Sequence, residues 1–172
     1  MDIARVVGWN DLDETAAKLM LLEKHPVNAM QYEWPKPGEH IRMELISWEM
    51  KKVRFYLDIF EGKRKSRVAL SIAPDRKVTM QCRGEKVLVR ADVSTIPEIL
   101  RHHNPDHGMV VGNHIHLDID GTGDRWAFPL NGQSVVPVTD SPFPGLPVEL
   151  LGAIEEACHI AGSNLKTGFP LV

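Results

Sequence analysis

Five of the eight histidines in this sequence fall between positions 102 and 116, which is a dense group of side chains able to do chemistry. An imidazole changes protonation near neutral pH, and its neutral ring nitrogen also binds metal ions. The group therefore indicates either acid–base catalysis or metal binding. Its members are His102, His103, His107, His114 and His116.

The last two histidines belong to a segment that alternates between polar and apolar residues. Residues 114–120 place His114, His116 and Asp118 on one face of a strand and three apolar side chains on the other. An earlier segment, residues 87–93, alternates in the same way. If the two strands are neighbours, one polar patch results, over which the connection carrying His102 and His103 can fold. The residues that meet in it are Arg90, Asp92, His114 and His116.

One interpretation of this patch is RNA cleavage without a metal or any other cofactor. One histidine would accept the proton of the 2′-hydroxyl group, and another would protonate the leaving oxygen. Arg90 would stabilise the charge that develops on phosphorus, and Asp92 would orient a histidine. The predicted catalytic residues are Arg90, Asp92, His102, His103, His114 and His116.

Two other interpretations remain open. His114 and His116, two residues apart on a strand, can begin a zinc or iron site, with Asp118 as the expected third ligand and His102, His103 or Asp120 as alternatives. The spacing also imitates the first metal motif of cupins, but no second motif follows. In the remaining interpretation the polar face is structural, and its side chains only form hydrogen bonds.

The charge distribution adds a candidate partner. Residues 51–90 carry twelve basic and four acidic side chains, a local charge of +8 in a chain whose net charge is −3. A basic block of this kind is typical of a surface that binds an anionic partner, most commonly nucleic acid. The alternative is that these are solvated positions that protect strand edges. The predicted RNA contacts are Lys63, Arg64, Lys65, Arg67, Arg83 and Lys86.

The elements expected around these residues give an α+β fold. A helix is predicted at residues 10–24 and another at 147–161, packed on one face of a single antiparallel meander of about six strands. Residues 1–130 form the expected core, and residues 131–172 a Pro/Gly-rich loop with the terminal helix. Residues 94–113 read as an irregular insertion with a helical turn near 96–100. The predicted strands cover residues 41–45, 53–59, 68–72, 78–82, 87–93 and 114–119, with 125–130 as a continuation.

Composition excludes several classes of protein. No run of 18 apolar residues occurs, so a membrane span is not expected, and the residues after Met1 do not form a secretory signal. Two cysteines make no disulfide framework. The expected location is the cytoplasm.

The motifs together resemble an uncharacterised family of small bacterial and prophage proteins over roughly residues 38–130. They are an Arg-x-Asp at 90–92, a His-x-Asn-Pro-Asp within 102–106, a His-x-His at 114–116 and a Gly-x-Gly-Asp-x-Trp-Ala at 121–127. The chain departs from the family pattern at His107, Asp118 and Thr122. The order of motifs is also similar to small RNA-acting toxins of toxin–antitoxin systems.

From these patterns we expect a nucleic-acid-directed protein, most concretely an RNA-cleaving domain. The alternative is a non-catalytic phage or prophage inhibitor or interaction protein, anti-defence or antitoxin-like, that binds a host protein complex. A metal-binding protein is the third hypothesis, and a protein partner, either an antitoxin or a host complex, is expected beside RNA.

Overall fold

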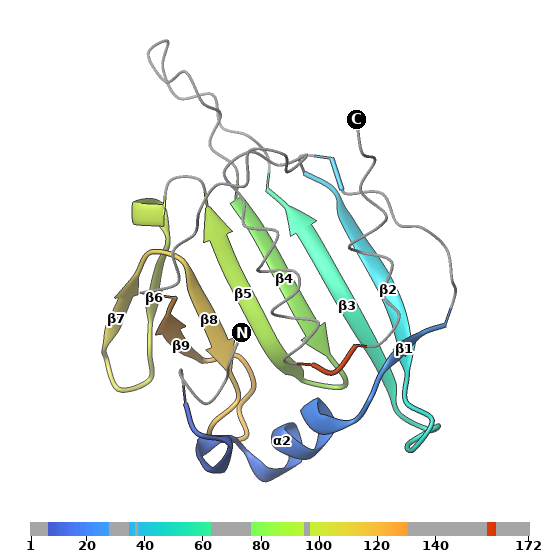
Figure 1. Ribbon diagram of the computed structural model, residues 1–172. Coiled ribbons are helices and arrows are strands. Elements are labelled where there is room, and N and C mark those ends of the chain that lie inside the picture. Colours follow the sequence, from blue (N-terminus) through green and yellow to red (C-terminus); the bar gives the residue numbers. More distant parts are fainter. Residues whose placement is uncertain are drawn as a thin grey trace.

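The computed structural model describes residues 7–27, 35–36, 38–62, 77–94, 97–130 and 158–160. Its centre is a seven-stranded antiparallel sheet with the strand order β1-β2-β3-β4-β5-β8-β9 (Figure 1), so the predicted antiparallel meander is confirmed. The strands are β1 (His25–Pro26), β2 (His40–Ile46), β3 (Arg54–Glu61), β4 (Lys77–Arg83), β5 (Val87–Ser94), β8 (His114–Leu117) and β9 (Trp126–Pro129). The predicted strand 68–72 lies outside the described residues.

The helix α2 (Glu14–Leu21) is shorter than predicted, and a 3₁₀ turn, η1 (Trp9–Asp11), precedes it. Asp13 is the residue that caps α2, because its side chain accepts hydrogen bonds from the backbone N–H groups of Thr15 and Ala16 at 3.1 Å. The chain becomes extended at Leu22, and the next segment pairs with β2 as β1. The helix therefore ends before Pro26, which lies in β1.

The hydrophobic core lies on one face of the sheet. It contains the buried apolar side chains of β2, β3, β4, β5 and β8 together with Ala16 and Met20 of α2. Figure 1 shows α2 running along one end of the sheet. Of the predicted C-terminal helix, 147–161, only residues 158–160 are described, and Cys158 and Ile160 belong to the same core.

The helical turn predicted near residues 96–100 is confirmed as the 3₁₀ turn η2 (Pro97–Ile99). The segment that follows is not irregular as predicted, because it forms a separate antiparallel hairpin of β6 (Arg101–His103) and β7 (Met109–Val111). A tight turn closes the hairpin, with a hydrogen bond of 2.8 Å from the N–H of Asn104 to the carbonyl oxygen of Gly108. Strands of three residues are too short to show an alternating pattern in the sequence.

None of the helices within the described part of the chain is both long enough and apolar enough to cross a membrane.

Candidate functional site: a buried histidine–aspartate cluster

The pairing of β5 with β8 brings four of the predicted site residues together. Arg90 lies opposite His116, and Asp92 lies opposite His114. The alternate pairs on these strands, such as Ala91 with Ile115, are buried in the hydrophobic core. Because side chains alternate between the two faces of a sheet, the four polar residues share the face opposite that core. We call Arg90, Asp92, His114 and His116 the histidine cluster.

Asp92 is the centre of the histidine cluster. Its Oδ2 atom lies 3.2 Å from Nε2 of His116 and 3.6 Å from Nε2 of His114. Arg90 donates to the same oxygen through Nε at 3.1 Å and Nη2 at 2.9 Å. Thr79 of β4 donates to the other oxygen at 2.5 Å. Burial alone would raise the pKa of Asp92, but hydrogen bonds with His114 and His116, the positive charge of Arg90 and the hydrogen bond from Thr79 hold it far below its ordinary value, so the carboxylate is ionised.

The other ring nitrogen of each histidine faces a backbone carbonyl group. Nδ1 of His114 lies 2.6 Å from the oxygen of Gly112, and Nδ1 of His116 lies 2.8 Å from the oxygen of Asp124. A carbonyl oxygen only accepts hydrogen bonds, so each Nδ1 carries a proton. An imidazole that is also protonated at Nε2 donates to Asp92, whereas the neutral form has its lone pair on Nε2, where it can bind an ion. Burial lowers the pKa of His116 and favours this neutral form.

Gly112 supplies one of these carbonyl groups from an unusual backbone conformation. Its φ of +103° is a value that residues with a Cβ atom rarely adopt. The turn between β7 and β8 therefore requires glycine at this position, and it aims the carbonyl oxygen at His114.

Arg90 and His102 close the histidine cluster from outside. Arg90 also pairs with the carboxylate of Asp124, and its Nη2 lies 3.0 Å from Nε2 of His116. The ring of His102, on β6, lies edge-on to that of His116 with 4.5 Å between centroids. Asn104 exchanges two hydrogen bonds with the backbone of Ala127 and so ties the hairpin to β9. As a result His116 is 0% exposed and His114 only 3%.

The remaining predicted site residues lie elsewhere. His103 is exposed, since it alternates with His102 on β6. Asp118, the predicted third metal ligand, is not part of the group of described residues that could hold a metal ion. Asp92 takes its place beside His114 and His116, and the three ligand atoms lie within 4.8 Å of one another. Sequence reasoning missed Thr79 and Asp124. Thr79 becomes a neighbour only through the β4–β5 register, while Asp124 belonged to a recognised motif without an assigned role.

The predicted RNA contacts are described only in part. Arg83 donates to the backbone oxygens of Gly84 and Glu85 at 3.4 and 3.3 Å, and Lys86 donates to that of Gly121. Both side chains thus hold turns of their own chain. The other four, Lys63, Arg64, Lys65 and Arg67, lie outside the described residues.

A second ion pair lies on the same face, two strands away. Arg42 of β2 donates to Asp58 of β3 through Nε at 2.6 Å and Nη2 at 3.0 Å, and Gln81 of β4 donates to the same carboxylate at 3.2 Å. The strand register places these three residues in one row with Arg90 and His116. The polar face is therefore a continuous set of cross-strand contacts.

Comparison with known proteins identifies a family but no activity. The family model described as "Family of unknown function (DUF6978)" matches residues 12–144, so the chain belongs to that family. No curated protein and no solved structure matches the chain. The expected membership of an uncharacterised family is thus confirmed, whereas the bacterial or prophage setting and the similarity to toxins stay predictions.

Proposed function

We propose that this member of a family of unknown function binds a divalent transition-metal ion, such as zinc or iron, through Asp92, His114 and His116. The observation that carries the proposal is the orientation of the two imidazoles. Both Nε2 atoms face one carboxylate oxygen, while both Nδ1 atoms donate to backbone carbonyl groups. Metal-binding histidines typically donate their second ring N–H in this way, which fixes the tautomer.

The distances between the ligand atoms suit a metal ion. Two ligand atoms that each lie about 2.1 Å from a tetrahedral ion are about 3.4 Å apart. The two Nε2 atoms lie 3.2 and 3.6 Å from Oδ2 of Asp92. Two histidines and one carboxylate also leave further coordination positions open, as in catalytic zinc and non-haem iron sites.

The charges of the site favour a cation. With neutral imidazoles, the carboxylates of Asp92 and Asp124 face one guanidinium group among the described residues, that of Arg90, which gives a formal charge of −1. Solvent reaches Asp124, which is 30% exposed, but Asp92 is buried, and a charge buried there costs free energy unless a proton or a cation compensates it. A divalent ion would provide this compensation.

Arg90 and the ion compete for the same lone pair. The guanidinium group donates to Nε2 of His116, so ion binding requires this hydrogen bond to break. The side chain of Arg90 is 25% exposed and keeps Asp124 as a partner, so it has a route towards solvent. We therefore expect Arg90→Gln to bind metal at least as tightly as the wild type.

The experiment is a titration of the purified, chelator-treated protein with Co²⁺, followed by competition with Zn²⁺. We expect one ion per chain, with absorption bands of low-symmetry cobalt coordination. His116→Gln and Asp92→Asn should each weaken binding by at least about 100-fold, since second-shell changes alone cost 10–100-fold. His103→Gln, at the exposed histidine on the hairpin, is the matched control and should bind as the wild type does.

Two outcomes would contradict the proposal: no stoichiometric ion in the wild type, or equal binding by wild type and by a folded His116→Gln variant. Circular dichroism of each variant establishes that it is folded. Either outcome would leave the histidine cluster as a structural network.

RNA cleavage and inhibition of a protein complex stay predictions. The near-complete burial of His114 and His116 does not favour cleavage in this arrangement, because a phosphodiester must reach both acid and base. A ribonuclease assay of wild type and His116→Gln, with and without added ion, tests cleavage directly. Isolation of a stable protein complex would support the inhibitor hypothesis.

A further inference from the structure

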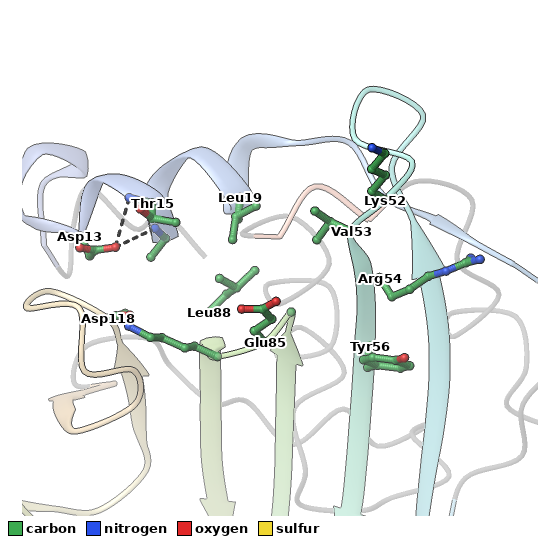
Figure 2. A pocket seen from close by; sticks show the side chains of 13 residues that line it. Asp13, Thr15, Leu19, Lys52, Val53, Arg54, Tyr56, Glu85, Leu88 and Asp118 are labelled. Carbon is green, nitrogen blue, oxygen red and sulfur yellow. Dashed lines mark hydrogen bonds between the residues drawn. The ribbon is translucent and has the colours of Figure 1, made fainter.

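A pocket of about 700 Å³ opens beside the first turns of α2. Its walls come from α2, from the start of β3 and the turn before it, from the β4–β5 turn, and from the residue after β8 (Figure 2). A volume of this size is ordinary for a small-molecule site. We call it the α2 pocket.

The two sides of the α2 pocket differ in charge. Figure 2 shows Asp13 and Asp118 on one side and Lys52 and Arg54 on the other. Between them lie the apolar side chains of Leu19, Val53 and Leu88 together with the carboxylate of Glu85. Lys86 also lines the pocket, and its ammonium group donates to the backbone oxygen of Gly121. A molecule that fills it would carry hydrogen-bond donors at one end, an apolar body, and an anionic group at the other end.

Asp118 is the residue that indicates most specifically where a hydrogen-bond donor of the ligand would bind. It is only 2% exposed, and within the described part of the chain its Oδ1 atom has no hydrogen-bond partner. A buried polar atom without a hydrogen-bond partner is costly, so a ligand donor that displaces the groups covering Oδ1 would stabilise the complex. The backbone of Asp118 is held in place by a 2.9 Å hydrogen bond from the N–H of Asp13.

At the opposite end of the pocket, the cationic side chains of Lys52 and Arg54 are available to an anionic ligand. Lys52 is exposed, and the side chain of Arg54, itself 54% exposed, makes an ion pair of 3.3 Å with Glu44. An exposed pair of this kind contributes little free energy, so an anionic ligand can replace it. Tyr56 lies on this side of the pocket and adds a phenol group to its wall.

The span between the two ends restricts the ligand. Asp118 follows β8, Arg54 begins β3, and the strand order between them is β8-β5-β4-β3. The register aligns Leu117 with Leu57, so Arg54 lies about two residues further along β3 than the row of Asp118. Three strand spacings of about 4.8 Å and two residues along the strand place these backbone positions about 16 Å apart. An α-amino acid carries its amino and acidic groups on one carbon, so it cannot contact both ends.

We propose that the α2 pocket binds a nucleoside monophosphate whose base carries an exocyclic amino group. The amino group donates to Asp118, the base and sugar lie against Leu19, Val53 and Leu88, and the phosphate group pairs with Lys52 and Arg54. The binding uses no residue of the histidine cluster.

The test is calorimetric titration with nucleotides matched for the amino group. Adenosine and guanosine monophosphates are compared with inosine monophosphate, and cytidine with uridine monophosphate. We expect at least one amino-bearing nucleotide to bind at least tenfold more tightly than its counterpart, because a site with a buried acceptor discriminates against a ligand lacking the donor. Asp118→Asn should remove this discrimination.

Separate variants test whether Lys52 and Arg54 bind the phosphate group. Lys52→Ala and Arg54→Ala should weaken binding of the preferred nucleotide at least tenfold, without changing the affinity for its nucleoside. Lys51→Ala is the matched control, since Lys51 is exposed and does not line the pocket. His116→Gln should bind nucleotide as the wild type does, which separates this proposal from the metal proposal.

The proposal is overturned if no nucleotide binds, or if inosine and uridine monophosphates bind as tightly as their counterparts. It is also overturned if Asp118→Asn keeps the discrimination, or if inorganic phosphate competes as well as the nucleotide does.

Discussion

The histidine cluster and the α2 pocket meet at β8, which carries His114 and His116 and is followed directly by Asp118, yet they differ in how their buried carboxylates are satisfied. Asp92 receives hydrogen bonds on both oxygens, from Arg90 and Thr79, and both histidines face it. Asp118 follows His116 by two residues on the same face and keeps one oxygen without a partner among the described residues. We call the histidine cluster the closed site, because both oxygens of its carboxylate have partners, and the α2 pocket the open site, because one oxygen of Asp118 has none among the described residues.

The cause of this difference is position along the strands. Asp92 lies within β5, where β4 and β8 flank it and supply partners at fixed register. Asp118 follows the last residue of β8, where the ladder stops and α2 and two turns take over. Regular pairing satisfies buried polar groups, whereas strand ends leave room for a ligand.

The largest expected effect comes from removing the centre of the closed site. Asp92→Ala removes the acceptor that Arg90 and Thr79 share, although Arg90 is 25% exposed and keeps Asp124 as a partner. Losing hydrogen bonds to a buried charged group in this way costs about 2–3 kcal/mol. Urea denaturation of both proteins in the presence of a chelator measures the free energy of unfolding.

Asp124→Ala is the control for that variant, since Asp124 pairs with Arg90 at a more exposed position. Its cost should be clearly smaller. If Asp92→Ala cost less than about 1 kcal/mol, the cluster would not be the closed network described above.

An intermediate effect is expected for the ion pair of Arg42 with Asp58, which lies in the same cross-strand row as Arg90 and His116. The side chain of Arg42 is half-exposed, and that of Asp58 is mostly buried. Burial raises the pKa of Asp58, but the hydrogen bonds from Arg42 and Gln81 lower it further, so the net pKa lies below its ordinary value. The stabilisation is therefore full above the unfolded pKa, near 3.9, and disappears as the pH falls through the lower folded value.

The measurement compares wild type with Asp58→Asn from neutral pH into the acid range. The difference in unfolding free energy, about 1 kcal/mol because Arg42 is half-exposed, should be constant above about pH 5 and shrink below about pH 4. A difference that grew in acid would show that the sign of the pKa shift is wrong.

The smallest effect should come from the open site. Asp118→Asn removes a charge but keeps the shape, and without ligand no hydrogen bond from a described donor to Oδ1 is lost. We expect a change of less than about 1 kcal/mol, because no hydrogen bond to Oδ1 from a described residue is broken. Thermal unfolding without nucleotide tests this. A large loss of stability would mean that Asp118 is satisfied by its own chain, and the contrast between the two sites would fail.

Much of the fold could be predicted because strand alternation is local. Residues 87–93 and 114–119 alternate clearly, so the faces of Arg90, Asp92, His114 and His116 were predicted without knowledge of distant neighbours. The hairpin of β6 and β7 could not be predicted, because three-residue strands carry no period. The start of α2 was misplaced because Asn10, Asp11 and Asp13 are all good capping residues.

The sequence by itself therefore determined which side chains share a face. The tertiary structure alone decided which of them meet, since the register of β4, β5 and β8 selects Thr79 and Asp92 as partners and leaves Asp118 outside the cluster. It also decided their burial, because the hairpin and Asn104 hold His102 over His116. Alternation follows from the geometry of a single strand, but partners and solvent access depend on contacts between segments that are distant in sequence.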